Sequence, residues 1–317
     1  MKPTVHIALS VHNGVPYLDE QIRSLQAQTH EGWRLWVRDD GSTDETPARL
    51  GEMAARDPRI HVHPRDGERL GTTLCHDWLL HRIPREARYV ASCDADDVWL
   101  PGKLERSLVA MQAAEAQGDG PVLVHTDLAV VDGELNQIAP SFWSYSGTAP
   151  EPTDLARLLV ANVATGPTLL LNRALLDRVL PIPAAAAYHD WWIALVASAF
   201  GRVVGVPEAT VLYRRHGANV TSGHTGNLRG AADGVRRLGG ARGRTSALRA
   251  WVAATGLQAA AFLLRFEDEL SADQTELLRD LASVPTRGFL GRKLGALRHH
   301  ALPERGFLRN LGLVLRV

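Results

Sequence analysis

Three aspartates crowd into one short stretch of the sequence, SCDADDVWLPGKLE, which runs from Ser92 to Glu105. Asp94, Asp96 and Asp97 follow directly on an apolar segment, so their carboxylates are expected where a strand ends. Like charges this close raise one another's pKa, and a chain tolerates them when water or a cation offsets the repulsion. A hard cation such as Mg²⁺ or Mn²⁺ prefers oxygen ligands and often takes one or two carboxylates together with substrate phosphates. The alternative is a solvated acidic turn that complements the dipole of the next helix.

A second carboxylate group lies in VRDDGSTDET, where Asp39 and Asp40 end another predicted strand. A carboxylate at this place can accept a hydrogen bond from a nucleotide base or a ribose hydroxyl. The alternative is an Asp-Gly turn followed by a helix cap, which needs no ligand. Because ligands of open α/β sheets bind beyond the carboxyl ends of the strands, we expect this pair to share one crevice with Asp94–Asp97.

The elements that would position these groups alternate along the first half of the chain. Apolar runs predict strands, and apolar residues at helical spacing predict helices between them. Such alternation indicates an α/β fold with a doubly wound, mostly parallel sheet flanked by helices. The predicted strands are residues 4–11, 33–39, 60–64, 87–94 and 121–132, and the predicted helices lie within residues 13–30, 46–56, 71–83 and 101–117.

The composition and the motifs that are missing narrow the class of protein further. The chain has 317 residues, with 45% hydrophobic and 22% charged, which is ordinary for a globular protein. Its formal net charge is zero, so no global field favours nucleic acid. Cys75 and Cys93 do not form a disulfide framework and are read as buried thiols in a reducing compartment. We expect neither a signal peptide nor a transmembrane helix, and the sequence contains no G-x-G-x-x-G and no G-x-x-x-x-G-K-[ST].

The charge is uneven along the chain. From Thr225 onward there are 15 Lys and Arg against 8 Asp and Glu, a net +7, which leaves −7 for residues 1–224. We therefore expect a catalytic domain over 1–222 and a basic, mainly helical C-terminal extension over 223–317. The Gly- and Arg-rich stretch from Ser222 to Ser246 is read as a linker or a loosely helical hinge, and the segments from Ala247 to Phe266 and after Ser271 as helices. The extension either caps the catalytic domain or lies on an anionic membrane as an amphipathic segment.

Four motifs, in order, carry a resemblance to a known family. ALSVHNGVPYLDEQIRSLQAQTHEGWRLWVRDDGSTDET resembles the start of inverting family-2 glycosyltransferases of the GT-A fold, and CDADDVWLPGKLE resembles their D-x-D motif. TGPTLLLNRALL resembles their glycine-containing acceptor-side loop, although Pro167 follows the glycine where many relatives have a small residue. HDWW and YRRHGAN are similar to the rhamnosyltransferase-like branch. The resemblance covers roughly residues 4–222.

The resemblance implies roles for particular residues. It implies a GT-A catalytic domain that binds Mn²⁺ or Mg²⁺ and a nucleotide-diphosphate sugar. Asp190 of HDWW stands where the family keeps its catalytic base. The residues implied to bind the nucleotide sugar are Ser10, His12, Asp40, Asp94, Asp96, Gly166 and Trp191, and those implied to hold the metal are Asp96, Asp97 and His216.

The chemistry is coherent for these groups. An inverting transfer needs a general base for the acceptor hydroxyl and a cation at the departing diphosphate. The indoles beside Asp190 favour an apolar setting that raises its pKa, as a base requires. Asp190 as a helix N-cap, and His216 as a structural histidine, are the alternatives. Trp191 is expected to stack on sugar and Trp192 to lie in the core.

The sequence therefore predicts a metal-dependent inverting glycosyltransferase of cell-surface polysaccharide synthesis. The resemblance favours dTDP-L-rhamnose as donor and a glycan or lipid-linked acceptor, with a UDP-hexose donor as the first alternative. A sugar-nucleotide nucleotidyltransferase would need an N-terminal Gly-rich phosphate loop, which ALSVHNGVPYL lacks, and a non-catalytic binding module would not need both carboxylate groups. We expect a cytoplasmic location, peripheral membrane contact through the extension, no nucleic-acid partner and, as a further option, a homo-oligomer.

Overall fold

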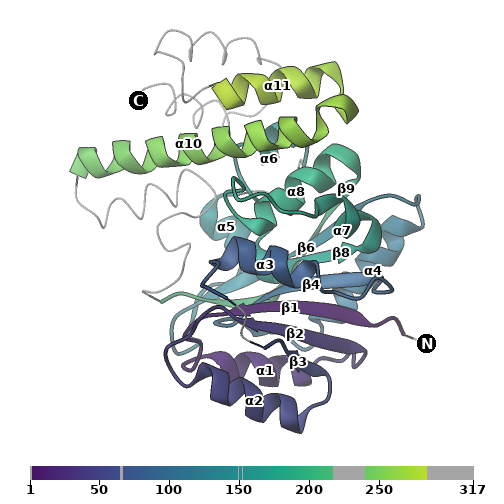
Figure 1. Ribbon diagram of the computed structural model, residues 1–317, viewed down its shortest axis with the longest axis vertical. Helices are drawn as coiled ribbons and strands as arrows, with labels where there is room; N and C mark the ends of the chain where they lie inside the picture. Colours follow the sequence, from purple (N-terminus) through teal and green to yellow (C-terminus); the bar gives the residue numbers. More distant parts are fainter. Residues whose placement is uncertain (1, 65–66, 149, 152, 217–239, 284–317) are drawn as a thin grey trace.

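The computed structural model describes residues 2–64, 67–148, 150–151, 153–216 and 240–283 (Figure 1). One sheet runs through the described part, in the order β3-β2-β1-β4-β8-β6-β9-β5, with β7 paired to β6. The strands are β1 (Val5–Val11), β2 (Trp33–Asp39), β3 (Ile60–Val62), β4 (Tyr89–Asp94), β5 (Val98–Trp99), β6 (Val122–Val131), β7 (Gln137–Ala139), β8 (Leu170–Asn172) and β9 (Arg202–Arg214).

The direction of the strands confirms the mostly parallel α/β sheet. Strands β3, β2, β1 and β4 are parallel neighbours, and β6 is parallel to β9. Strand β8 is antiparallel to both β4 and β6, so β6 and β9 point the same way as β4. Strands β5, β7, β8 and β9 were not predicted as strands; three of them are two or three residues long, too short for periodicity to show.

Helices cover both faces of this sheet. They are α1 (Leu18–Gln26), α2 (Thr46–Arg56), α3 (Thr72–Leu80), α4 (Lys103–Glu115), α5 (Phe142–Ser146), α6 (Leu155–Leu158), α7 (Arg173–Val179), α8 (His189–Phe200), α10 (Gly240–Phe266) and α11 (Ala272–Ser283), with the 3₁₀ turns η1 (Gly166–Thr168) and η2 (Glu267–Glu269). The helix predicted over Thr46–Arg56 has the observed bounds. In the stretch predicted to be a linker or a loosely helical hinge, α10 already begins at Gly240, so the last part of the stretch is helical; residues 222–239 lie outside the described residues.

Strand residues alternate between two buried layers. Ile7 and Leu9 belong to a core shared with α1, α2 and α4, whereas Ala8 belongs to a second core shared with α3, α7 and α8. In β4 the same alternation separates Ala91 from Val90. A strand that is apolar on both faces gives the continuous apolar runs seen in the sequence. Both cysteines are buried free thiols, as predicted.

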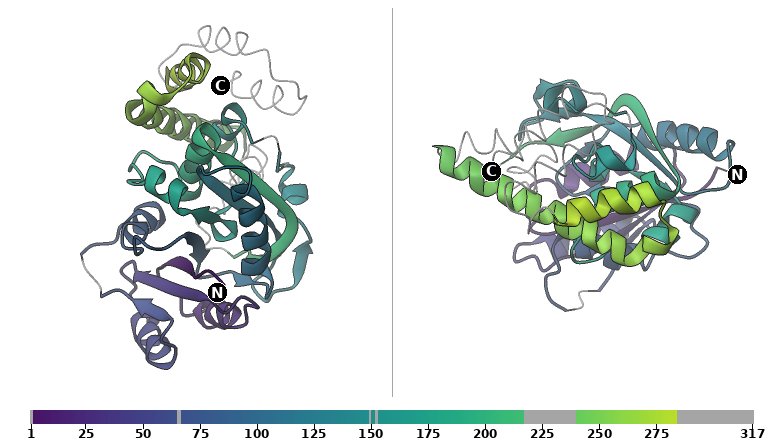
Figure 2. Two further views of the ribbon diagram at one scale, coloured as in Figure 1. Left: turned by 90° about the vertical axis from the view of Figure 1, so that its right-hand side faces the viewer. Right: turned by 90° about the horizontal axis from the view of Figure 1, so that it is seen from above.

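The C-terminal helices pack on the second core. Phe262 of α10 is fully buried, and its ring lies 5.4 Å from that of Trp192 in α8. The guanidinium of Arg265 donates hydrogen bonds to the carbonyl oxygens of Val179 (2.9 Å) and Arg178 (2.7 Å), at the end of α7. Figure 1 and Figure 2 show α10 and α11 together at one end of the molecule, furthest from α1 and α2. The helical extension therefore contacts the helix that begins with His189 and Asp190.

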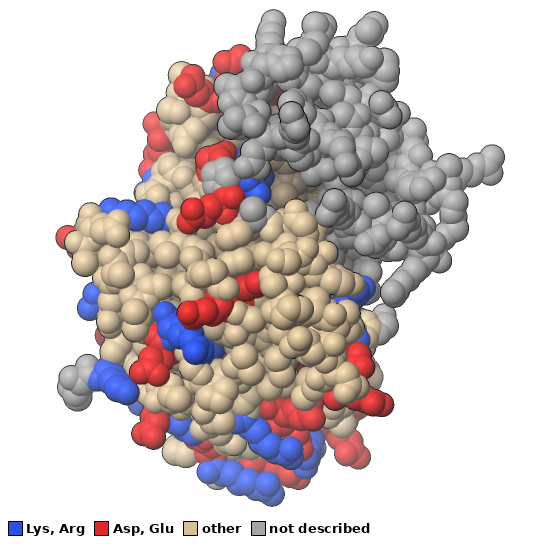
Figure 3. Space-filling view, turned by 180° about the vertical axis from the view of Figure 1, so that it is seen from behind, with Lys and Arg blue, Asp and Glu red and all other residues tan. Residues whose placement is uncertain are grey.

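Charges are mixed on the face behind that of Figure 1. Figure 3 shows acidic and basic side chains of this face intermingled, several of them in contact, with broad uncharged areas between the groups. In the part of the chain described, no helix combines the length and apolarity needed to cross a membrane. The basic segment after residue 283 lies outside the described residues.

Candidate active site

Strand ends bring the predicted site residues to one edge of the sheet. Ser10, near the end of β1, is the lateral neighbour of Asp94 at the end of β4 and of Arg38 in β2. His12 follows β1, partly buried, with no hydrogen-bond partner at Nδ1. The parallel arrangement thus places groups from three separate sequence segments side by side, as predicted from the pattern of strands and helices.

The first two loops of this edge interlock. The N–H of Asn13 donates to Ser42 Oγ and that of Gly14 to Thr46 Oγ1, both at 2.8 Å. Gly14 is required here, because a Cβ would come within 2.4 Å of the Val11 side chain. The Asp39 carboxylate accepts from Ser42 N–H, which is the turn that the Asp-Gly pair predicts. These contacts fix the loops around the position predicted for the nucleotide.

Asp40 is almost fully buried and holds a third loop. Its Oδ1 accepts from the N–H of Leu70 (2.8 Å) and the Arg38 guanidinium (2.5 Å), and its Oδ2 accepts from the N–H of Gly71 (2.8 Å). Arg38 is buried with it; burial acts to lower the pKa of Arg38, but its hydrogen bonds with Cys75 and Asp40 raise that pKa above the usual value. Asp40 therefore shapes the loop that leads into α3, and its expected contact with the base stays a prediction.

Asp96 and His216 meet although 120 residues separate them. His216 Nε2 lies 3.0 Å from Asp96 Oδ2, and the imidazole stacks on Tyr17 with the ring centres 4.8 Å apart. Arg214 stabilises the same region: its N–H donates to Asp97 Oδ1 (3.1 Å) and its Nε to the Asp96 carbonyl (2.9 Å). The end of β9 is thereby held against the D-x-D segment.

Two residues of this region were not assigned a role from the sequence. The Tyr17 ring has the Arg214 guanidinium 4.6 Å from its centre and also contacts His216. Arg214 is 2% exposed and forms an ion pair with Glu20 of α1. The letters Y-R-R-H and N-G-V-P-Y contain both residues, but only the fold shows that they touch.

Asp97 is fully buried, and its Oδ2 has no hydrogen-bond partner in the protein. Burial, together with the charges of Asp96 and Asp94, raises its pKa well above the usual value. A lone buried carboxylate oxygen of this kind calls for a proton or a cation. Among the described residues, no three His, Cys, Asp or Glu side chains converge to hold a metal ion. The expected metal-binding role of Asp96, Asp97 and His216 therefore stays a prediction, and a cation there would need further oxygen ligands, such as those of a substrate phosphate.

Asp94 lies between this group and Asp190. Burial, with added repulsion from Asp96 and Asp190, raises the pKa of Asp94 to about 8. Gly166 is packed beside it, since a Cβ on that glycine would lie 3.6 Å from Asp94 Oδ2. A cation bound here would relieve the repulsion among the three carboxylates.

Asp190 lies in the first turn of α8 and is not its N-cap, which is Tyr188. Its Oδ2 accepts from the N–H of Gly166 at 2.9 Å, and its Oδ1 from that of Trp191 at 2.6 Å. Burial raises the pKa of Asp190 to about 6, although these N–H donors act in the opposite direction. A carboxylate with this pKa can accept a proton near neutral pH.

The structure corrects the expectation for Trp191. Its side chain is 1% exposed, and its Nε1 donates to the carbonyl of Leu158 in the core. Helix α8 is apolar around its whole circumference, so the residue after Asp190 turns inward and its ring is not available to stack on sugar. Trp192 is fully buried, as predicted.

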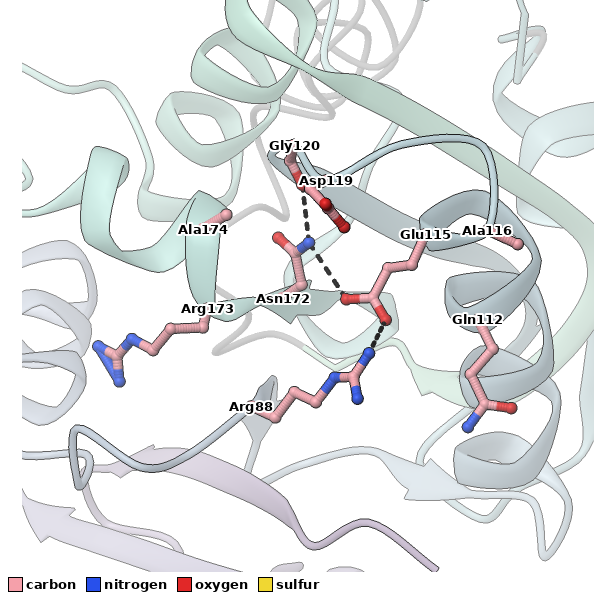
Figure 4. A pocket seen from close by; sticks show the side chains of 9 residues that line it. All are labelled: Arg88, Gln112, Glu115, Ala116, Asp119, Gly120, Asn172, Arg173 and Ala174. Carbon is pink, nitrogen blue, oxygen red and sulfur yellow. Dashed lines mark hydrogen bonds and ion pairs between the residues drawn. The ribbon is translucent and has the colours of Figure 1, made fainter.

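A surface pocket of about 460 Å³ lies elsewhere, at the amino end of β4 (Figure 4). Arg88, Glu115 and Asn172 line it, and they bond one another: Glu115 accepts from Arg88 (2.7 Å) and from Asn172 (3.3 Å). Because these polar groups are already paired, and the strand ends of the candidate site lie at the opposite edge of the sheet, this pocket is not the candidate active site.

Comparisons with known proteins bear on the family and on the fold. The chain is 34% identical over 110 residues to TuaG, a Bacillus subtilis (strain 168) glycosyltransferase assigned provisionally by its name to teichuronic acid biosynthesis; the match covers 35% of this chain and 42% of that protein. Its fold is similar to that of S. aureus TarS 1–349 in complex with UDP-GlcNAc, with a TM-score of 0.55, 14% identity and coverage of 92% of this chain and 83% of that one. It is also similar to the mannosyltransferase PcManGT from Pyrobaculum calidifontis in complex with GDP-Man and Mn²⁺, with a TM-score of 0.52, 17% identity and coverage of 93% and 84%. The profile of the family described as Glycosyl transferase family 2 matches residues 6–180, more than half of the chain, and the protein is therefore a member of that family.

Proposed function

We propose that this glycosyltransferase transfers a sugar, with inversion, from a nucleotide-diphosphate donor to an acceptor hydroxyl, with Asp190 as general base. The observation that carries the proposal is the position of Gly166. Its N–H bonds the Asp190 carboxylate at 2.9 Å, and its α-carbon faces the Asp94 carboxylate. A base is thereby held next to the D-x-D segment, which is the relation that an in-line displacement needs.

Each group then has a task in the transfer. Asp190 accepts the proton of the acceptor hydroxyl as its oxygen attacks the sugar. Ser10, His12, Asp40 and Asp94 bind the nucleotide and ribose, and Asp96, Asp97 and His216 hold a divalent cation, Mn²⁺ or Mg²⁺. When bound, that cation offsets the charge of the departing diphosphate. Trp191 has no place in this assignment, because it is buried.

The proposed identities of the sugar donor and of the acceptor rest on resemblance to other proteins. The H-D-W-W and Y-R-R-H-G patterns favour dTDP-L-rhamnose, and a UDP-hexose is the alternative. The relative TuaG is named for teichuronic acid synthesis, which supports a glycan or lipid-linked acceptor in cell-surface polysaccharide assembly. A cytoplasmic enzyme meets such acceptors at the inner face of the membrane.

The C-terminal extension supplies the membrane contact in this proposal. Residues 284–317 contain seven Lys and Arg and one acid, Glu304, in an apolar background. Basic and apolar groups together bind anionic lipid surfaces. Sedimentation with vesicles of phosphatidylcholine alone or with added phosphatidylserine tests this: the full chain should bind only the anionic vesicles. Equal recovery with both, or with neither, would contradict it.

The metal–nucleotide site is tested without knowing the acceptor. The melting temperature is measured with dTDP, UDP, GDP and CDP, each with and without Mn²⁺. A ligand that binds only the folded state stabilises it by about 2.7 kcal/mol at 100 times its Kd. We expect a shift with one nucleotide that requires Mn²⁺ and is lost in Asp96→Ala. No shift with any nucleotide would refute the cation site.

A further inference from the structure

His189, the residue before Asp190, lies in an unusual buried contact. Its imidazole is 4% exposed and stacks on that of His76 in α3, with the ring centres 3.7 Å apart and the planes within 5°. Its Nε2 lies 3.1 Å from Ser92 Oγ in β4. One side chain of α8 therefore contacts both the helix and the strand on the donor side of the site.

The protonation of this pair follows from its surroundings. His76 Nδ1 lies 2.9 Å from the carbonyl oxygen of Thr72, and since a carbonyl only accepts, that nitrogen carries the proton. Burial lowers the pKa of His76 to about 4, and burial and the neighbouring His76 lower that of His189 well below its usual value. The two rings are neutral at physiological pH and can stack closely.

The same ring supports the loop that holds Asp190. A Cβ on Gly166 would lie 3.3 Å from His189 Nε2 and 3.4 Å from its Cε1, so the glycine backbone rests on the edge of the imidazole. From there the Gly166 N–H reaches Asp190 Oδ2. The contacts form a closed path: Ser92 to His189, His189 to Gly166, Gly166 to Asp190, and Asp190 back to His189 through the helix.

We infer that His189 is a positioning residue for Asp190: clamped between His76 and Ser92, it supports the Gly166 backbone that fixes and shields the carboxylate. It makes β4, which ends at Asp94, and α8, which carries Asp190, one rigid unit. The inference rests on the proposed role of Asp190 as base. Acceptor activation then depends on a side chain that touches neither substrate.

The test measures the pKa of Asp190 by NMR in the full chain labelled with ¹³C at aspartate carboxyl groups, the Asp190 signal being identified by its loss in Asp190→Asn. The wild type should titrate near pH 6. In His189→Gln, which keeps an N–H donor but loses the ring, water reaches the carboxylate. Because burial outweighs the Gly166 N–H in setting this pKa, the midpoint should fall by about one unit or more. Ser92→Ala should shift it in the same direction.

His6→Gln is the matched control. His6 is also a buried imidazole, 8% exposed, bonded by a side chain (Trp36 Nε1 to His6 Nδ1, 3.0 Å) and stacked on its ring, but at the amino end of β1. It should leave the Asp190 midpoint unchanged. Should folded His189→Gln and Ser92→Ala both titrate like the wild type, the inference is wrong; if His189→Gln does not fold, Ser92→Ala decides.

Separate measurement of kcat and of the donor KM gives a second test. With the donor whose nucleotide raises the melting temperature, His189→Gln should lower kcat roughly tenfold or more and leave the donor KM unchanged, because the loss concerns orientation. A raised KM at unchanged kcat would contradict the positioning role. If no nucleotide binds the wild type, the proposed function fails, whereas the Asp190 titration still decides whether His189 supports that carboxylate.

Discussion

Two opposing influences act on the Asp190 carboxylate: hydrogen-bond donors favour its ionised form, and burial favours its protonated form. Gly166 and Trp191 donate N–H groups to it, while burial raises its pKa to about 6. We expect Asp190→Asn to keep the fold and to lower kcat by roughly 10² to 10⁴, the usual contribution of a general base. Steady-state kinetics measures this, and the nucleotide-dependent shift in melting temperature should stay. Turnover near the wild-type rate would exclude Asp190 as the base.

The pH dependence follows from the same residue. A base must be ionised, so kcat should fall about tenfold per pH unit below about pH 6. With a solvated aspartate as the base, kcat would stay constant down to about pH 4. The raised pKa of Asp190 also makes stability depend on pH. Its contribution to the free energy of unfolding is fully present below 3.8, the pKa of the carboxyl in the unfolded chain, and is lost as the pH rises through about 6. A kcat profile that stays flat from pH 7 to pH 4 would show that Asp190 does not titrate as proposed.

Gly166 has little room for a side chain beside His189. Its Cβ would need His189 to move by a few tenths of an ångström, and His189 is clamped by Ser92. We expect Gly166→Ala to lower kcat roughly tenfold through displacement of Asp190. The control is Gly51→Ala, where a Cβ meets nothing within 4 Å. Equal kcat values for both variants would show that the loop accommodates the added Cβ without displacing Asp190.

At the scale of the elements, helix α2 contains a glycine that destabilises it and can be replaced. Gly51 lies exposed inside that helix, in an ordinary helical conformation. Because glycine loses more backbone entropy than alanine on folding, Gly51→Ala should raise the free energy of unfolding by roughly 0.5–1 kcal/mol. Urea denaturation measures it. Gly71→Ala should do the opposite, since Gly71 has a φ of +77°; stabilisation by both would refute the backbone argument.

At the scale of the whole molecule, the helical extension and the catalytic domain share a core. Phe262 contacts Trp192, and Gln258 Oε1 accepts from the Ala187 N–H at 3.0 Å, just before His189. Phe262→Ala should therefore cost about 3–5 kcal/mol. Leu264→Ala on the same helix should change stability by about 0.5 kcal/mol at most, because Leu264 is 90% exposed.

Thermal unfolding followed by far-UV and near-UV circular dichroism checks this. Both signals should move together in Phe262→Ala, because the tryptophans of the catalytic domain report on the same core. A loss of helix signal at a lower temperature, with the aromatic transition unchanged, would mean that α10 and α11 unfold as a separate unit.

The sequence by itself determined the alternation of strands and helices, the doubly wound sheet and the segments that carry chemistry. It could do so because these depend on local periodicity and on a topological rule that brings parallel strand ends together. Asp40, Asp94 and Asp96 were placed at one edge of the sheet on that basis. The family followed from motif order.

Only the tertiary structure decided which side chains point into the site. Trp191 and Asp190 are adjacent in sequence, yet one turns into the core while the other bonds Gly166. Lys103 begins a helix like a surface residue but is fully buried, with its ammonium 3.9 Å from the centre of the Trp99 ring. Side-chain direction and the stacking of His76 on His189 depend on packing between elements far apart in the chain, and no local pattern encodes that packing.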